Sequence, residues 1–99
     1  MMPVSLQSVY RKTESFVHRA IADEVILVPI RQDVADLESI YALNGVAPRI
    51  WELVDGQRTI DELVAAVIDE YEIDRAKAQT DVVEFLERLE MLKALERVS

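Results

Sequence analysis

Hydrophobic and polar residues alternate in the first half of the chain, a pattern that is typical of β-strands. The alternation runs through residues 16–22, a β-branched run follows at 25–30, and residues 37–43 alternate again. In the last of these segments Tyr41 and Leu43 fall on one face, because side chains alternate along a strand. We therefore predict three antiparallel strands in this half of the chain.

The second half shows the spacing of amphipathic helices, with clear signals at the ends of each helix. Asn44 is expected to cap the first helix through its side-chain oxygen, and Gly56 follows the end of that helix. Thr59 and Glu62 form the sequence of a capping box at the start of the second helix. Asp74 is expected to cap the third. The apolar stripe of this third helix consists of Ala78, Val82, Phe85, Leu86, Leu89 and Leu92.

Strands followed by helices predict an α+β domain. The expected architecture is winged helix-turn-helix-like, with a three-stranded antiparallel sheet at the N-terminus followed by three helices. Residues 1–15 lack clear periodicity and are expected to form a flexible N-terminal segment, because chain termini fray unless they are docked. Residues 16–99 then form the folded domain, and residues 95–98 either extend the last helix or add a short strand.

The composition fits one folded domain of 99 residues, because 51% of the residues are hydrophobic. The absence of cysteine excludes disulfides, thiolate metal sites and cysteine nucleophiles. The first residues show no basic region followed by an apolar block, and no apolar run reaches membrane-spanning length. We therefore expect a cytoplasmic protein that does not contact a membrane.

A net charge of -8 argues against binding to nucleic acid, whose phosphates select basic surfaces. The second predicted helix carries Asp61, Glu62, Asp69 and Glu70 with no lysine or arginine between them. In the third predicted helix, acidic residues balance the basic ones. Neither helix is expected to present a positive face, although a helix-turn-helix corner could otherwise suggest DNA.

Residues for catalysis or metal binding are sparse. His18 is the only histidine, and it lies in an alternating segment where a residue on the sheet surface is expected. Asp33, Asp36 and Glu38 fall in a polar loop or strand end, lack the spacing of a calcium loop and are expected to be solvated. Two glycines are too few for a glycine-rich phosphate loop. We predict no catalytic residue, no metal and no cofactor, and hence no enzyme.

Three segments together resemble the PqqD family: residues 21–30, residues 33–44 and residues 50–56. The resemblance covers roughly residues 16 to 95. Its most specific part is the Leu43-Asn44 junction followed by a helix that ends in Asp55-Gly56. The predicted capping box and the final helix also fit this family.

The resemblance implies a non-catalytic protein that recognises ribosomally made, modified peptides. Such a domain binds the leader part of a precursor peptide and presents it to a modifying enzyme, often a radical SAM protein. The leader adds as a strand beside the third strand and packs against the third helix. Carried onto this sequence, the resemblance places the peptide-binding site on Glu38, Ser39, Ile40, Tyr41, Ala42, Leu43, Asp81, Val82, Phe85, Leu86, Arg88 and Leu89.

Two other functions stay open from the residues alone. A winged-helix regulator, or a protein–protein scaffold without a role in peptide modification, has the same expected fold. A cofactor-handling enzyme is the third reading, and it requires tight binding of a small molecule without peptide. A strand edge that accepts a peptide can also accept a second copy of the chain, so homodimerisation is open as well.

Overall fold

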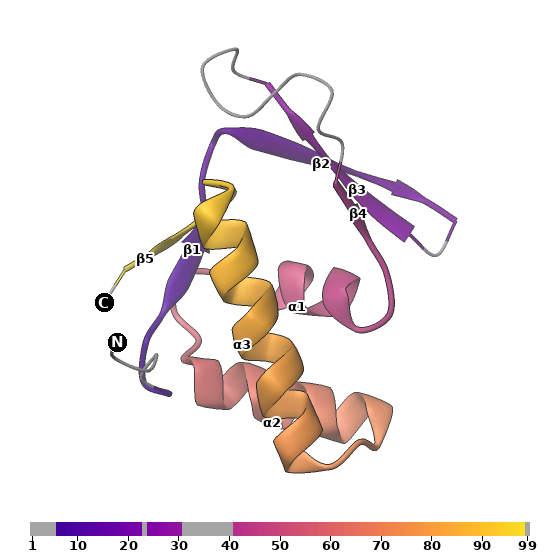
Figure 1. The fold of residues 1–99 in the computed structure, drawn as a ribbon, viewed down its shortest axis with the longest axis vertical. Coiled ribbons are helices and arrows are strands. Elements are labelled where there is room, and N and C mark those ends of the chain that lie inside the picture. The colour runs from indigo at the N-terminus through magenta and orange to yellow at the C-terminus, as the bar shows by residue number, and fades with distance from the viewer. Residues whose placement is uncertain (1–5, 23, 31–40, 99) are drawn as a thin grey trace.

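A three-stranded antiparallel sheet covers one end of the molecule (Figure 1). Its strands are β2 (Phe16–Ile21), β3 (Glu24–Pro29) and β4 (Tyr41–Leu43), in the order β2-β3-β4. The computed structural model describes residues 6–22, 24–30 and 41–98, so the predicted strand residues before Tyr41 lie outside the described part. The α+β class is confirmed, with this sheet before three helices.

The pairing of β3 with β4 gives the sheet an inner and an outer face. Leu27 lies opposite Tyr41, and Val25 lies opposite Leu43, so these side chains share the inner face. Leu27 and Leu43 are buried against the helices, whereas Ala42 points to the outer face and is exposed. The prediction that Tyr41 and Leu43 share a face is therefore confirmed.

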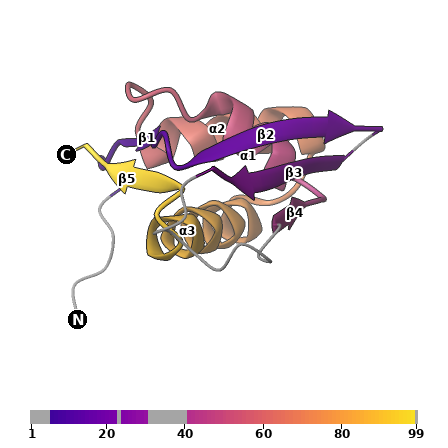
Figure 2. The same ribbon diagram turned by 90° about the horizontal axis from the view of Figure 1, so that it is seen from above.

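Three helices pack below this sheet: α1 (Ala47–Leu53), α2 (Ile60–Tyr71) and α3 (Arg75–Met91). Figure 2 shows α1 under the strands and α3 on the side where β4 lies. The helices bury one stripe each, as amphipathic spacing requires. The buried helical side chains are Ile50, Trp51, Leu53, Ile60, Leu63, Val64, Val67, Ala78, Val82, Leu86 and Leu89.

Two predicted helix caps are confirmed. The Thr59 hydroxyl accepts a hydrogen bond from the backbone N–H of Glu62 at 3.2 Å, and the Glu62 carboxylate accepts one from the Thr59 N–H at 2.8 Å. This reciprocal capping box satisfies two backbone donors that the first turn of α2 leaves free. At the start of α3, the Asp74 carboxylate accepts from the backbone N–H of Lys77 at 2.8 Å.

The predicted cap at Asn44 is wrong. The N-cap of α1 is Val46, and no side chain caps this helix. Gly45 adopts a left-handed conformation with φ 64°, which turns the chain between β4 and α1. The helix therefore begins later than Asn44, whose backbone carbonyl accepts from the N–H of Ala47 at 3.1 Å instead.

A second, two-stranded sheet joins β1 (Tyr10–Lys12) to β5 (Leu95–Arg97). Its strand β1 lies within residues 1–15, which we expected to be flexible, and β5 is the short strand that was one of two expectations for residues 95–98. Tyr10 is 1% exposed, and its hydroxyl donates to the Glu90 carboxylate at 3.3 Å. Burial, together with the nearby charge of Glu90, raises the pKa of Tyr10 to about 12. The strand forms because distant residues of α3 and β5 bury it, and local periodicity does not report such contacts.

No helix in the described part of the chain is long and apolar enough to cross a membrane.

Candidate functional site

Among the described residues, β4 pairs with β3 along one edge and with no strand along the other. The N–H of Ile30 donates to the carbonyl of Ser15 at 3.0 Å. Ile30 therefore points its backbone groups at β2, and so do the even-numbered residues of β3, whereas the odd-numbered residues of β3 point theirs at β4. Backbone groups of successive residues point to opposite edges of a strand. Tyr41 and Leu43 therefore point their backbone groups at β3. Ala42 points its N–H and carbonyl toward the free edge.

A groove of about 300 Å³ lies next to this edge, between the start of α1 and the middle of α3. Figure 2 shows how α3 runs alongside β4. The turn after β4 and the first turn of α1 form one wall, and α3 forms the other. The lining residues are Asn44, Gly45, Val46, Ala47, Ile50, Asp81, Glu84, Phe85 and Arg88.

The middle of the groove is apolar. Phe85 from α3 and Val46 and Ala47 from the opposite wall are half-buried, and Ile50 is fully buried. Half-buried apolar side chains leave area that a ligand can cover, and covering it is favourable. The groove can therefore accept an apolar side chain between the two helices.

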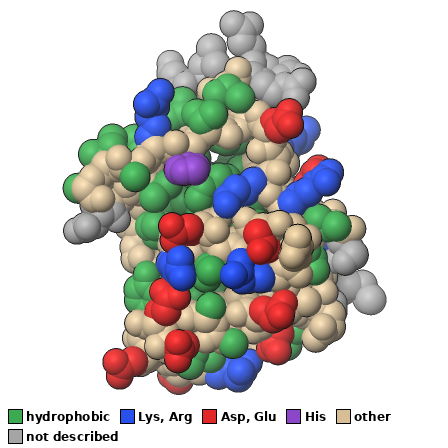
Figure 3. Space-filling model, turned by 180° about the vertical axis from the view of Figure 1, so that it is seen from behind, with side chains coloured by type: hydrophobic (Ala, Val, Ile, Leu, Met, Phe, Trp, Pro, Cys, Tyr) green, Lys and Arg blue, Asp and Glu red, His purple; other side chains and the backbone are tan. Residues whose placement is uncertain are grey.

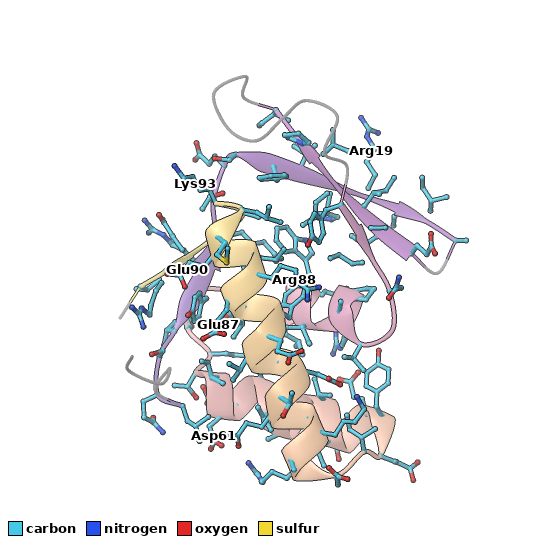
Figure 4. The ribbon with its side chains drawn as sticks, in the orientation of Figure 1. Arg19, Asp61, Glu87, Arg88, Glu90 and Lys93 are labelled. Carbon is cyan, nitrogen blue, oxygen red and sulfur yellow. The ribbon has the colours of Figure 1, made fainter. Side chains whose placement is uncertain are left out.

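The two ends of the groove carry opposite charges. Asp81 forms an ion pair with Lys77 at 3.2 Å, so its charge is partly compensated. Glu84 and Arg88 line the groove one turn apart, and neither forms an ion pair with a described residue. Figure 4 shows Arg88 on the side of α3 toward α1, whereas Glu87 and Glu90 lie on the other side. The groove thus offers one free cation and one free anion.

The structure separates the predicted site residues into four groups, the fourth of which lies in the core. Glu38, Ser39 and Ile40 lie outside the described residues. Tyr41, Ala42 and Leu43 form β4, with only the Ala42 backbone directed to the free edge. Asp81, Phe85 and Arg88 line the groove.

Three predicted groove residues belong to the core. Val82 and Leu86 are 0% exposed and Leu89 is 1% exposed, so their side chains are unavailable to a ligand in this structure. They lie at the centre of the buried stripe of α3, whereas Asp81, Phe85 and Arg88 lie at its margin. In this structure Val82, Leu86 and Leu89, which we predicted as part of the groove wall, therefore lie in the core.

Sequence reasoning missed Glu84 and the residues on the α1 side of the groove. The sequence pattern marks Glu84 only as one of the acidic residues that balance the basic residues of α3. Its position was available as a signal, because residues three and four apart on a helix are neighbours. Glu84 follows Asp81 by three residues and precedes Arg88 by four. Val46 and Ala47 carry no comparable signal, since the groove exists only once α1 packs next to α3.

Within the described residues, no group of histidine, cysteine, aspartate or glutamate side chains could hold a metal ion. The loop carboxylates Asp33 and Asp36, considered for a hard cation, lie outside this part. The groove itself contains no histidine, serine, cysteine or lysine among its lining residues. It has the features of a binding surface: a backbone edge, an apolar centre and two unpaired charges.

The model of the family described as coenzyme PQQ synthesis protein D (PqqD) matches residues 24–95. The chain belongs to the PqqD family. The match includes β3, β4, all three helices and the start of β5, and therefore every residue that forms the groove. It also agrees with the resemblance found in the sequence.

A solved structure is also similar to this chain. It is TbiB1 in complex with the TbiA(beta) leader peptide, at 30% sequence identity and a TM-score of 0.70. The similarity covers 87% of this chain and 94% of the TbiB1 chain. A search of curated proteins finds no match.

Proposed function

We propose that this PqqD-family protein binds the leader segment of a ribosomally made precursor peptide by strand addition at β4. The observation that carries the proposal is the free backbone edge at Ala42 beside the groove between α1 and α3. The similarity to TbiB1, which was solved with a leader peptide, supports this choice of ligand.

In the proposed complex, the leader lies antiparallel or parallel to β4 and exchanges hydrogen bonds with the Ala42 backbone. Main-chain bonds of this kind supply affinity without regard to sequence, and pockets for alternate side chains supply specificity. One inward side chain of the leader lies in the apolar centre of the groove against Phe85. Glu84 and Arg88 then select the charges of its neighbours. The predicted binding residues Glu38, Ser39 and Ile40 precede Tyr41 in the sequence and stay a prediction.

The protein acts on the bound peptide through a partner. We propose that it presents the leader to a modifying enzyme, a radical SAM protein being the first candidate, and that it carries out no reaction itself. The described lining of the groove offers apolar area and two unpaired charges but no histidine, serine, cysteine or lysine, and this arrangement favours binding and release. Homodimerisation through the β4 edge would compete with the leader for the same backbone groups.

The distribution of charge supports a peptide ligand over duplex DNA. Arg49, Arg58, Arg75 and Lys77 on or near the helices all form ion pairs with aspartate or glutamate. Their charges are therefore engaged within the protein. A winged-helix regulator needs cations free to neutralise phosphates, because these contacts dominate its affinity.

Titration of synthetic leader peptides into ¹⁵N-labelled protein tests the proposal. The leaders are taken from short precursor genes next to the gene for this chain. We expect amide shifts at Ala42, Val46, Phe85 and Arg88 that saturate with peptide. Scrambled peptides of the same composition are the control. Saturating concentrations of every neighbouring leader with no shift at these residues would contradict the proposal.

A further inference from the structure

The sheet has a second free edge, at β2. The carbonyl of Ser15 points at β3, and so do the backbone groups of the odd-numbered residues of β2. The backbone groups of the alternate residues therefore point outward, away from β3. These residues are Phe16, His18 and Ala20. No described strand pairs with this edge. It has six residues, compared with three in the described part of β4.

This edge lacks the features that usually protect an exposed strand from association. Exposed edges commonly carry proline, lysine or a bulge, or are covered by a loop. β2 contains no proline and no lysine, and its only full charge, Arg19, points away from the helices (Figure 4). Val17 and Ile21 are 40% and 57% exposed on the outer face. The edge is therefore chemically suited to accept another strand.

A groove of about 350 Å³ lies under the β2 edge, on the opposite side of the molecule from the α3 groove. It forms because β2 extends beyond the helices that cover the rest of the inner face, so that only Phe16 of this strand is buried. Figure 3 shows this face, with hydrophobic side chains and the histidine around the hollow below the sheet. We name it the hairpin groove; its apolar part consists of Ala20, Val25, Pro48, Trp51 and Tyr71.

The polar end of the hairpin groove is formed by Lys12 and His18, which both contact the ring of Trp51. The Lys12 ammonium lies 5.2 Å from the ring centroid, and the His18 ring meets it edge-on at 6.2 Å. The Lys12 ammonium donates to the carbonyl of Val54 at 3.0 Å but forms no ion pair with a described residue. Burial lowers the pKa of Lys12, because its charge is partly desolvated and the carboxylates of Asp55 and Glu52 offset this only in part.

The other charged residues of the hairpin groove compensate one another. Arg49 forms ion pairs with Glu52 at 2.6 Å and with Glu70 at 2.9 Å. Lys12 is therefore the cation that an incoming carboxylate can pair with. Trp51 adds an unsatisfied donor, because its indole N–H is buried and has no acceptor among the described residues.

We propose that the β2 edge and the hairpin groove form a second strand-addition site, which binds an extended segment of a partner protein. Opposite His18 this segment carries a carboxylate, within reach of Lys12. Two residues away on the same face, opposite Ala20, the partner segment carries an apolar side chain. This side chain enters the part of the hairpin groove that is lined by Val25 and Pro48. The site is separate from β4, so the partner and the proposed leader peptide can be bound at the same time.

The charge of the chain favours a different protein over a second copy as the occupant. Two copies of net charge -8 repel each other. The described part of β2 also offers no carboxylate to the Lys12 of another copy. A partner segment with one acidic residue matches the free cation, whereas β2 of a second copy would bring His18 and Arg19.

The test uses an acetylated and amidated heptapeptide of alternating valine and threonine, with glutamate and leucine two residues apart on one face. It is titrated into the full ¹⁵N-labelled chain to about 10 mM, the range in which a weak strand addition is detected. We expect shifts at the His18 and Ala20 amides and at the Trp51 indole. Trp51 is the only tryptophan, so its indole N–H gives a single signal. Ala42 and Phe85 report on β4 and should not shift, which separates this test from that of the leader site.

Two matched peptides and one variant complete the test. The same peptide with lysine in place of glutamate should bind about tenfold more weakly. The peptide with N-methyl groups on the amides that face β2 should not bind. In the Lys12→Gln variant, the glutamate and lysine peptides should bind equally.

Each contrary result overturns the proposal. The first such result is that the His18 and Ala20 amides do not shift. The second is that the glutamate and lysine peptides bind the original protein equally well, and the third is that the N-methylated peptide binds as tightly as the peptide without N-methyl groups. Shifts of His18 and Ala20 that depend on protein concentration without peptide would assign the edge to a second copy instead.

Discussion

Glu84 and Arg88 lie one turn apart on α3, yet their side chains do not pair with each other. A glutamate four residues before an arginine is favourably placed for an ion pair on a helix. Here both side chains line the groove next to β4, and neither has an ionic partner among the described residues. Their charges therefore remain available to a ligand in that groove.

Arg88→Glu should weaken leader binding by about tenfold or more, because it places two like charges in the groove. Arg88 is exposed, so the free energy of unfolding should change by less than about 0.5 kcal/mol. Isothermal titration calorimetry and chemical denaturation measure the two quantities. Arg97→Glu on β5 is the matched control, with the same change of net charge away from the groove. Equal loss of binding in both variants would assign the effect to net charge.

Ala42→Pro should abolish leader binding while the β3–β4 ladder is kept. Proline removes the N–H that points to the free edge, and it removes no hydrogen bond to β3. Ala42→Ser keeps the N–H and should bind the leader like the unchanged protein. Amide shifts of Val25 and Leu27 report whether β3 and β4 still pair. Retained binding by the proline variant would exclude strand addition at this edge.

Leu86→Ala and Phe85→Ala distinguish the core from the groove on α3. Leu86 is fully buried, so its truncation should lower the free energy of unfolding by about 2–5 kcal/mol. Phe85 is half-buried and lines the groove, so its truncation should lower leader affinity more than it lowers stability. Denaturation and titration of both variants provide the comparison. A larger loss of stability for Phe85→Ala than for Leu86→Ala would reverse the assignment.

Thr59→Ala should destabilise the protein by about 1 kcal/mol, because it removes the side-chain half of the capping box of α2. Thr80→Ala is the matched control, since Thr80 is exposed within α3 and alanine favours a helix there. Urea denaturation followed by circular dichroism measures both. If the two variants lose equal stability, the cap at Thr59 contributes nothing specific.

Asp55 should make stability depend on pH in the acidic range. Backbone N–H groups of Arg58 and Gln57 donate to its carboxylate and hold the pKa below the ordinary value of 3.8. Because the pKa is lower in the folded state, the ionised carboxylate stabilises the fold at pH values above the ordinary pKa. This stabilisation is lost as the pH falls through the pKa of the folded state. Asp55→Asn keeps an acceptor but cannot ionise. The stability difference between the two proteins should shrink below pH 3.8, and a constant difference would contradict this.

The parts of this fold that follow from neighbouring residues were predictable from the sequence. Thr59 and Glu62 specify their capping box within four residues, and Asp74 specifies its cap in the same way. Asn44 has the chemistry of a cap, but the left-handed turn at Gly45 delays the helix. Such a turn depends on how β4 must connect to α1, which no local pattern reports.

The parts that depend on distant contacts were not predictable. Tyr10 bonds to Glu90 across 80 residues of sequence, and three-residue strands are too short to show alternation. On α3, periodicity placed Val82 and Phe85 on one stripe, but only the position of α1 decides which of them is covered. The same limit applied to the β2 edge, because a sequence does not show where the helices stop covering a strand.

The ladder between β1 and β5 has a consequence for protein engineering. It sets Tyr10 opposite Arg97, so the first and last strands of the described domain lie side by side. A domain whose ends are adjacent can be inserted into a surface loop of a larger protein without being stretched. The β4 edge belongs to the other sheet and should remain free in such an insertion. This chain is thus a candidate for a module that can be placed inside an unrelated enzyme.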